Sequence, residues 1–189
     1  IYMEEYSDYN EFGDGYEEME PYTVKNAGIK YGLYLGVVSI VLALLQFMSL
    51  GNSANIIIMG ASVIISVLAI VFAHNEFKRN NEGFMSYSEG LGIGVLVSVV
   101  SGAMSAVFGV LYRTVIDPEF NQKVLDATRR TLEEAGTYTE AQIEQTIEMS
   151  QKFSSPGMLL LFGLIASAVI GLLMSLVISA ITKNKRPMF

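Results

Sequence analysis

Four long apolar runs constrain this chain more than any other feature. None contains Asp, Glu, Lys or Arg, and they cover Tyr31–Leu50, Ala54–Ala73, Leu91–Tyr112 and Gly157–Thr182. A helix of about 20 apolar residues crosses the hydrocarbon core of a bilayer. Strands of a membrane barrel alternate apolar and polar residues, whereas these runs are apolar on every face. The sequence therefore predicts an all-α polytopic membrane protein with four transmembrane helices.

The connections between the runs predict how the helices follow one another. Only the short segment GNSAN separates the first two runs, so those helices should form an antiparallel hairpin. The third and fourth runs should form a second hairpin. A polar segment, residues 117–155, is inserted between them.

The insert begins at a junction that should stop one helix and start another. Asp117 is a good N-cap, and Pro118 suits the first turn of a helix. Apolar positions then recur at a spacing of four from Phe120 to Leu132, which is typical of an amphipathic helix. Gly136 should end that helix.

A second helix should follow within the insert. Thr139 and Gln142 have the spacing of a capping box, and an apolar side follows. We thus expect residues 117–155 to form an amphipathic helical hairpin. Its apolar sides could pack together, on the bundle mouth, or on a partner. The candidate partner-docking residues are Phe120, Val124, Leu132, Ile143, Ile147 and Phe153.

Small residues form stripes along the predicted spans. At a spacing of four they occupy one helix face, and they let two backbones approach closely in lipid. We expect the stripes to pack the bundle, and a second chain could use one of them instead. The candidate helix-packing residues are Gly28, Gly32, Gly36, Gly94, Ser98, Gly102, Gly163, Ser167, Gly171 and Ser175.

Basic residues predict the orientation, because they tend to stay on the cytoplasmic side of a membrane. Seven lie in short flanks on one side of the predicted membrane, namely Lys25, Lys30, Lys78, Arg79, Lys183, Lys185 and Arg186. We therefore expect both termini in the cytoplasm and residues 117–155 on the outer, periplasmic face. The expected domains are an acidic, Tyr-rich tail at 1–23 and a membrane domain at 24–186.

The residues that usually carry membrane or enzyme chemistry are missing from this sequence. The centres of the spans contain no ionisable residue, which disfavours a pump or coupled transporter. His74 is the only histidine, and we expect it at a helix end near the interface, without companions for a metal. No cysteine is present. We therefore expect no enzyme activity, catalytic residue, metal or cofactor, and no nucleic-acid partner.

Arg113 and Asp117 stand four residues apart near the outer end of the third span. At that spacing on a helix they could form an ion pair. Alternatively, Arg113 could meet an anionic lipid head group, with a ligand held in serine-lined grooves between the third and fourth spans.

The order of several short motifs resembles an uncharacterised family of four-helix bacterial membrane proteins, catalogued as domain of unknown function 4199 and typical of Bacteroidota. The matching residues are Lys30-Tyr31-Gly32 with Gly36, Gly83-Phe84-Met85-Ser86-Tyr87, Ile116-Asp117-Pro118, and the run Ser175-Leu176-Val177-Ile178-Ser179-Ala180-Ile181. The resemblance covers residues 24–186. It implies a bacterial inner-membrane protein without an established activity, and it associates the family with polyprenyl-linked glycosyl transfer.

Two functions from different classes follow from these features. The first is a non-enzymatic inner-membrane subunit or scaffold, a homo-oligomer or part of a membrane complex, which docks a partner through residues 117–155. The second is a lipid- or small-molecule-binding membrane protein, accessory to polyprenyl-linked glycosyl transfer. Membrane lipids are expected partners in both.

Overall fold

A computed structural model describes residues 22–50 and 54–186. The described part is all-α, and no strand occurs in it beyond an isolated antiparallel bridge between Met85 and Asn184. In chain order the helices are α1 (Val24–Met48), α2 (Ala54–Arg79), α3 (Tyr87–Leu111), the π-helical turn η1 (Tyr112–Ile116), α4 (Phe120–Ala135), α5 (Glu140–Phe153) and α6 (Pro156–Thr182).

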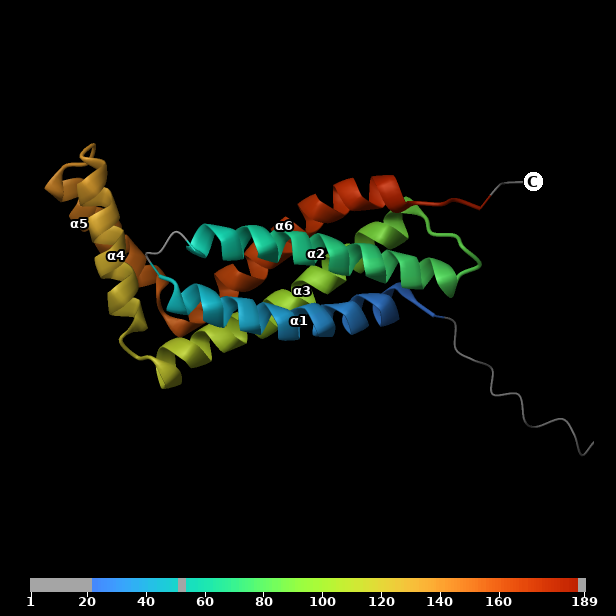
Figure 1. Cartoon of the computed structure of the whole chain (residues 1–189), viewed down its shortest axis with the longest axis horizontal. Helices are drawn as coiled ribbons and strands as arrows, with labels where there is room; N and C mark the ends of the chain where they lie inside the picture. The colour runs from blue at the N-terminus through green and yellow to red at the C-terminus, as the bar shows by residue number, and fades with distance from the viewer. Residues whose placement is uncertain (1–21, 51–53, 187–189) are drawn as a thin grey trace, which may run out of the picture.

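Four helices, α1, α2, α3 with η1, and α6, are long and apolar enough to cross a membrane, which confirms the predicted class. They lie side by side, and α4 and α5 lie across one end (Figure 1). We call this the distal end, and we call the opposite end, where α1 begins and α6 ends, the terminal end. The helix α3 is central, since it packs most extensively against both α1 and α6. The main partner of α1 is therefore α3, although the short connector pointed to α2.

Glycines set the distance between α1 and α3. A β-carbon on Gly28 would stand 2.6 Å from Cβ of Leu96, and one on Gly32 would stand 2.7 Å from Cβ of Val100. Gly36 faces Met104 in the same way. Each step of four along α1 matches a forward step of four along α3, so the two helices run parallel.

The opposite side of α3 packs on α6 through alternating small residues. Gly94 meets Ser175, and Gly102 meets Ser167. In turn, Gly171 meets Ser98. These steps run backward along α6, so α3 and α6 are antiparallel. The last pair along this interface is Gly163 with Ala106. A β-carbon on the glycine would lie 3.0 Å from that of the alanine.

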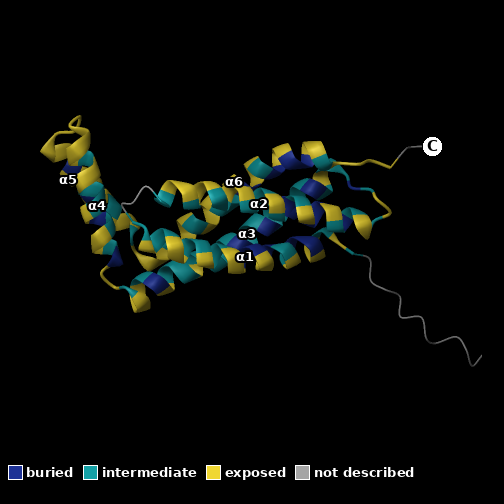
Figure 2. Cartoon of the chain, viewed as in Figure 1, coloured by how far each residue is buried: buried dark blue, intermediate teal, exposed yellow. Residues whose placement is uncertain are grey.

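Burial is concentrated in the half of the bundle nearest the terminal end (Figure 2). The core there consists of Ala27, Leu35, Ile70, Ala73, Phe77, Met85, Ile93, Val97 and Ile178. Toward the distal end, the sides of the helices expose apolar residues such as Ile57 and Ile64 of α2. An apolar side wall without a protein partner is what a bundle presents to lipid.

The start of α4 differs from the sequence-based expectation. The helix begins at Phe120 after Glu119, and a turn in which the Phe120 amide donates to the Asp117 carbonyl precedes it. Asp117 is therefore not its N-cap. The reason is η1, in which the Asp117 amide donates to the Tyr112 carbonyl at 2.7 Å. The wider π-turn extends to Ile116, so an α-helix capped by Asp117 does not follow directly from α3.

The other boundaries of the α4–α5 pair are confirmed. Gly136 ends α4 in a left-handed conformation with φ of 64°, which favours glycine. Thr139 and Gln142 form the predicted capping box at the start of α5. Pro156 is the first residue of α6, where its missing N–H removes no helical hydrogen bond.

Candidate functional site

An aromatic cluster attaches α4 to the distal end of the bundle. The Phe120 ring lies 4.9 Å from that of Phe47 on α1 and 5.3 Å from that of Tyr112 in η1, as measured between centroids. Phe47 and Tyr112 are themselves 4.7 Å apart. Phe120 is 3% exposed. Tyr112 is also buried and Phe47 is half-buried, so these ring contacts attach α4 to α1 and η1.

Arg113 does not form the expected ion pair with Asp117. Lys123 binds that carboxylate instead, with Nζ 3.0 Å from Oδ1 and 2.7 Å from Oδ2. The hydrogen bond to Asp117 raises the pKa of Lys123. The physical reason is again η1, because Asp117 lies beyond the π-turn and no longer one α-helical turn above Arg113. The Arg113 guanidinium lies over the rings of Phe47 and Phe120, at 5.9 and 5.3 Å.

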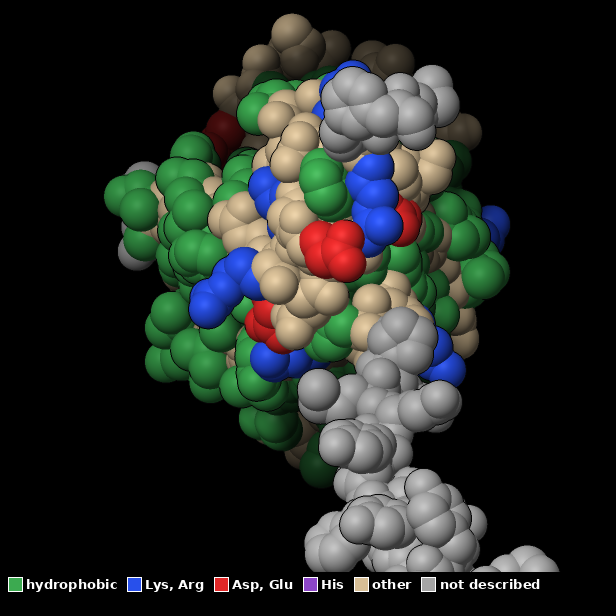
Figure 3. Space-filling view, turned by 90° about the vertical axis from the view of Figure 1, so that its right-hand side faces the viewer, with side chains coloured by type: hydrophobic (Ala, Val, Ile, Leu, Met, Phe, Trp, Pro, Cys, Tyr) green, Lys and Arg blue, Asp and Glu red, His purple; other side chains and the backbone are tan. Residues whose placement is uncertain are grey.

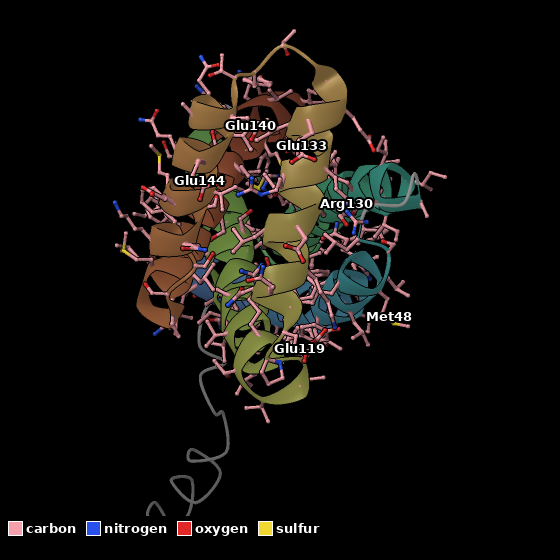
Figure 4. All side chains as sticks on the ribbon, turned by 90° about the vertical axis from the view of Figure 1, so that its left-hand side faces the viewer. Met48, Glu119, Arg130, Glu133, Glu140 and Glu144 are labelled. Carbon is pink, nitrogen blue, oxygen red and sulfur yellow. The ribbon has the colours of Figure 1, made fainter. Side chains whose placement is uncertain are left out.

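The helices α4 and α5 share a small hydrophobic core. Leu125 of α4 packs against Ile143 and Ile147 of α5, and all three are buried. At the rim, Arg129 binds Glu144 at 2.6 Å. This pair raises the pKa of Arg129. Acidic residues Glu119, Glu133, Glu140 and Glu144 lie at this end of the molecule (Figure 4).

The face of α5 turned away from α4 forms an open groove, which we call the α5 groove. It has a volume of about 670 Å³. Tyr138 and Met149 are each 51% exposed, and Phe153 is 43% exposed. Amide and hydroxyl side chains lie between these apolar residues, and the lining includes Tyr138, Gln142, Gln145, Thr146, Met149 and Phe153.

Most of the predicted docking residues contact the chain itself. Phe120, Ile143 and Ile147 are buried, Val124 and Leu132 are half-buried, and Phe153 is exposed. Tyr138 and Met149 were not predicted as docking residues. Their signal in the sequence is weak, because the groove positions between them, Gln142, Gln145 and Thr146, are polar and no regular apolar repeat results.

A second groove, of about 720 Å³, lies between α4 and the ends of α1 and η1. Its lining mixes two basic residues, Lys123 and Arg130, with three acidic ones, Asp117, Asp126 and Glu134. Met48 and Arg130 both line it and are labelled in Figure 4. Because both signs of charge are present, this lining does not favour one class of charged ligand.

At the terminal end, the carboxylate of Glu76 on α2 binds three groups. Lys30 and Tyr22 lie 2.7 Å from Oε1, and the Tyr31 hydroxyl lies 2.8 Å from Oε2. Tyr22 precedes α1, so this cluster fastens the first described residue to the bundle. Tyr22 and Thr23 fall inside the predicted tail, and the rest of the predicted tail, 1–21, lies outside the described residues.

His74 is fully buried, which corrects the expectation of an interfacial residue. Its Nε2 lies 2.8 Å from the Gly90 carbonyl oxygen, and its Nδ1 lies 2.8 Å from Oγ1 of Thr182. The side chain therefore joins α2 to both α3 and α6. In the described part of the chain, no group of three or more His, Cys, Asp or Glu side chains could hold a metal ion.

The serine-lined face between α3 and α6 is filled by the packing itself. Ser175 and Ser98 each press against a glycine of the facing helix. The hydroxyls of Ser175 and Ser179 are buried without a hydrogen-bond partner among the described residues. This interface is a close-packed contact, so it leaves no groove for the ligand that the sequence analysis considered there.

The fold defines a class, that of multi-pass membrane proteins with four apolar spanning helices and a short amphipathic helix pair between the third and fourth. The distal cluster and the Glu76 cluster fasten its two ends. The model of one family, described as protein of unknown function (DUF4199), matches residues 30–184. The chain belongs to this family.

Two further comparisons found no relative. No curated protein matches the chain. No solved structure matches it either. Two of the family-like motifs make contacts between distant parts of the chain. In the first, Tyr31 binds Glu76 and Gly32 packs on α3. In the second, the backbone of Met85 pairs with that of Asn184.

Proposed function

We propose that the chain is a non-enzymatic membrane subunit or scaffold that holds a rigid helix pair at one membrane face for a partner protein. The observation that carries this proposal is the α5 groove. It combines exposed apolar side chains with hydrogen-bonding groups, on a helix whose other face is already buried. Exposed apolar patches rimmed by polar residues mark interaction sites.

Attachment of the helix pair to the bundle supports the same role. Phe120 is buried on the bundle, and Ile143 is buried on α4. A helix pair that is already folded loses less conformational entropy when it binds than an unfolded segment would.

The distribution of basic residues supports the proposed orientation. Lys and Arg side chains surround the terminal end in Figure 3, with apolar side chains along the flanks. By the positive-inside rule this end lies in the cytoplasm. In an inner membrane, the α4–α5 pair then lies in the periplasm, and its partner is another copy, a membrane protein or a periplasmic protein.

Gentle extraction from native membranes, followed by mass measurement and mass spectrometry, tests the proposal. A particle heavier than one 20.7 kDa chain, with a second protein or further copies in fixed ratio, is expected. Met149→Glu should release that partner, because it places a charge inside the α5 groove. Ala141→Glu adds the same charge on an exposed position of α5 outside the groove, and it should retain the partner.

The result that would overturn the proposal is equally definite. A single chain without any protein in fixed ratio excludes the scaffold role. Retention of the partner by Met149→Glu excludes the α5 groove as its docking surface.

Lipid or small-molecule binding is the second candidate function. Because α3 and α6 pack closely, the serine stripe between them leaves no room for the expected ligand. The observation that favours this function is Arg113, whose cationic group no carboxylate in the described part of the chain neutralises.

A further inference from the structure

We propose that Arg113 binds the phosphate group of a membrane lipid at the distal end of the bundle. This inference deepens the second candidate function, lipid binding, and it is independent of the docking role of α5. It rests on the position of Arg113, on its lack of a partner, and on the way its side chain is held.

The position is that of a lipid head group. Arg113 lies in η1, at the end of the third apolar span. The residues around it are exposed and apolar, with Leu111 50%, Val115 71% and Ile116 60% exposed. Exposed apolar side chains at this level lie in the hydrocarbon layer, and an arginine next to them reaches the interface where phosphates lie.

The guanidinium lacks a protein anion. The nearest candidate in sequence, Asp117, is bound by Lys123 through both carboxylate oxygens. The Nε atom of Arg113 is buried and has no hydrogen-bond partner among the described residues. A buried donor without a partner is costly. The Nη atoms of Arg113 are not buried in this way, so a phosphate oxygen can reach the charged group through them.

The side chain is held in place before any ligand arrives. The guanidinium lies over the rings of Phe47 of α1 and Phe120 of α4, and both rings belong to the aromatic cluster that attaches α4. These contacts restrict the position of the guanidinium, whose planar set of donors suits bidentate binding of phosphate.

Binding of phosphatidylglycerol, measured by native mass spectrometry on the full chain in mild detergent, tests the inference. Wild type should bind this anionic lipid more tightly than the zwitterionic phosphatidylcholine. Arg113→Gln should weaken binding of phosphatidylglycerol about tenfold, the loss expected for one charge-assisted hydrogen bond. Arg79→Gln removes an exposed arginine at the terminal end, away from this junction, and it should bind like wild type.

Arg113→Lys keeps the positive charge, so this variant still tests the site if the glutamine variant does not fold. Lysine offers no planar pair of donors, so its affinity should also fall, though less. Inorganic phosphate alone, added to the purified protein, separates the two sources of the group. If it raises the melting temperature of wild type while phosphatidylglycerol does not bind, the phosphate is a soluble one and the lipid assignment is wrong.

The remaining outcomes distinguish the inference from the function it rests on. Equal binding of phosphatidylglycerol by wild type, Arg113→Gln and Arg113→Lys would overturn the Arg113 site while leaving lipid binding in place. Binding of neither lipid nor phosphate by wild type would overturn both.

Discussion

Gly32 of α1 and Val100 of α3 approach so closely that a β-carbon on the glycine would stand 2.7 Å from Cβ of the valine. The backbone carbonyl of Val97 lies 3.2 Å from the same point. A methyl group can be accommodated only if the two helices separate. In a membrane, this close packing is the main attraction between helices.

Gly32→Ala should therefore destabilise the bundle. Overpacking costs about 1–3 kcal/mol, which a lower melting temperature in detergent would report. Gly60→Ala is the matched control, because nothing lies within 4 Å of its added carbon. It should be neutral or stabilising by up to roughly 1 kcal/mol. Equal effects of the two substitutions would contradict the role of Gly32 in packing.

Glu76→Gln should loosen the start of α1. It removes the charge that binds Lys30, Tyr22 and Tyr31, and hydrogen bonds to a charged group contribute roughly 1.5–3 kcal/mol. Faster tryptic cleavage at Lys25 and Lys30 would measure the loosening. Glu82→Gln breaks an exposed pair with Arg186, and such pairs contribute only about 0–1 kcal/mol. If both variants are cleaved alike, the Glu76 cluster does not hold α1.

Tyr22 should ionise late and give the bundle a pH dependence on the alkaline side. Burial, together with the hydrogen bond to Glu76, raises the pKa of Tyr22 above its ordinary value of 10.0. The contribution of Tyr22 to the free energy of unfolding is then complete below pH 10 and declines as the pH rises toward the raised pKa. Tyrosine absorbance during alkaline titration measures this. Tyr22→Phe should remove the change in absorbance at the most alkaline end of the titration. If the substitution removes only absorbance change near pH 10, the pKa of Tyr22 is not raised.

Phe120→Ala should detach α4 and α5 from the bundle. Truncation of a buried phenylalanine costs about 3–5 kcal/mol, and Phe120 is the residue of α4 that enters the aromatic cluster. Faster hydrogen exchange across residues 120–153, with little change in α3, is expected. Phe153→Ala truncates an exposed ring that contacts only Phe162 among the described aromatic residues, and it should leave exchange in α4 unchanged. Similar exchange in both variants would show that other contacts attach the pair.

The absence of cysteine from the sequence makes the orientation directly measurable. Ser88→Cys at the terminal end and Ala141→Cys on α5 each introduce one exposed thiol. In intact cells, a membrane-impermeant thiol reagent should label the second and spare the first, because the terminal end carries the basic flanks. Labelling of Ser88→Cys alone would reverse the proposed orientation.

Local signals in the sequence were sufficient for the positions of the helices. The capping box of Thr139 with Gln142, and Gly136 before it, act within a few residues of one another, so their pattern is readable without a structure. The spans were readable from length and hydropathy alone. Because they are apolar on every face, only glycines such as Gly32 and Gly94 indicated which faces meet.

The contacts that the sequence analysis missed join residues far apart along the chain. His74 binds Thr182, 108 positions away, and Glu76 binds Tyr22, 54 positions away. A periodic pattern in the sequence does not indicate which residues so far apart will contact each other. Tyr112, at the start of the π-turn, packs on Phe47 and Phe120. Because the turn is π-helical rather than α-helical, the i+4 spacing of Arg113 and Asp117 was misleading.

The π-helical turn at Tyr112–Ile116 also determines which changes in chain length the protein tolerates during evolution. Loss of one residue there would restore ordinary α-helical hydrogen bonds and turn everything that follows by about 100°, since an α-helix has 3.6 residues per turn. The α4–α5 pair would then leave the bundle in another direction, away from Phe47. Insertions and deletions should therefore accumulate in the loop around Tyr138 and be purged from this turn.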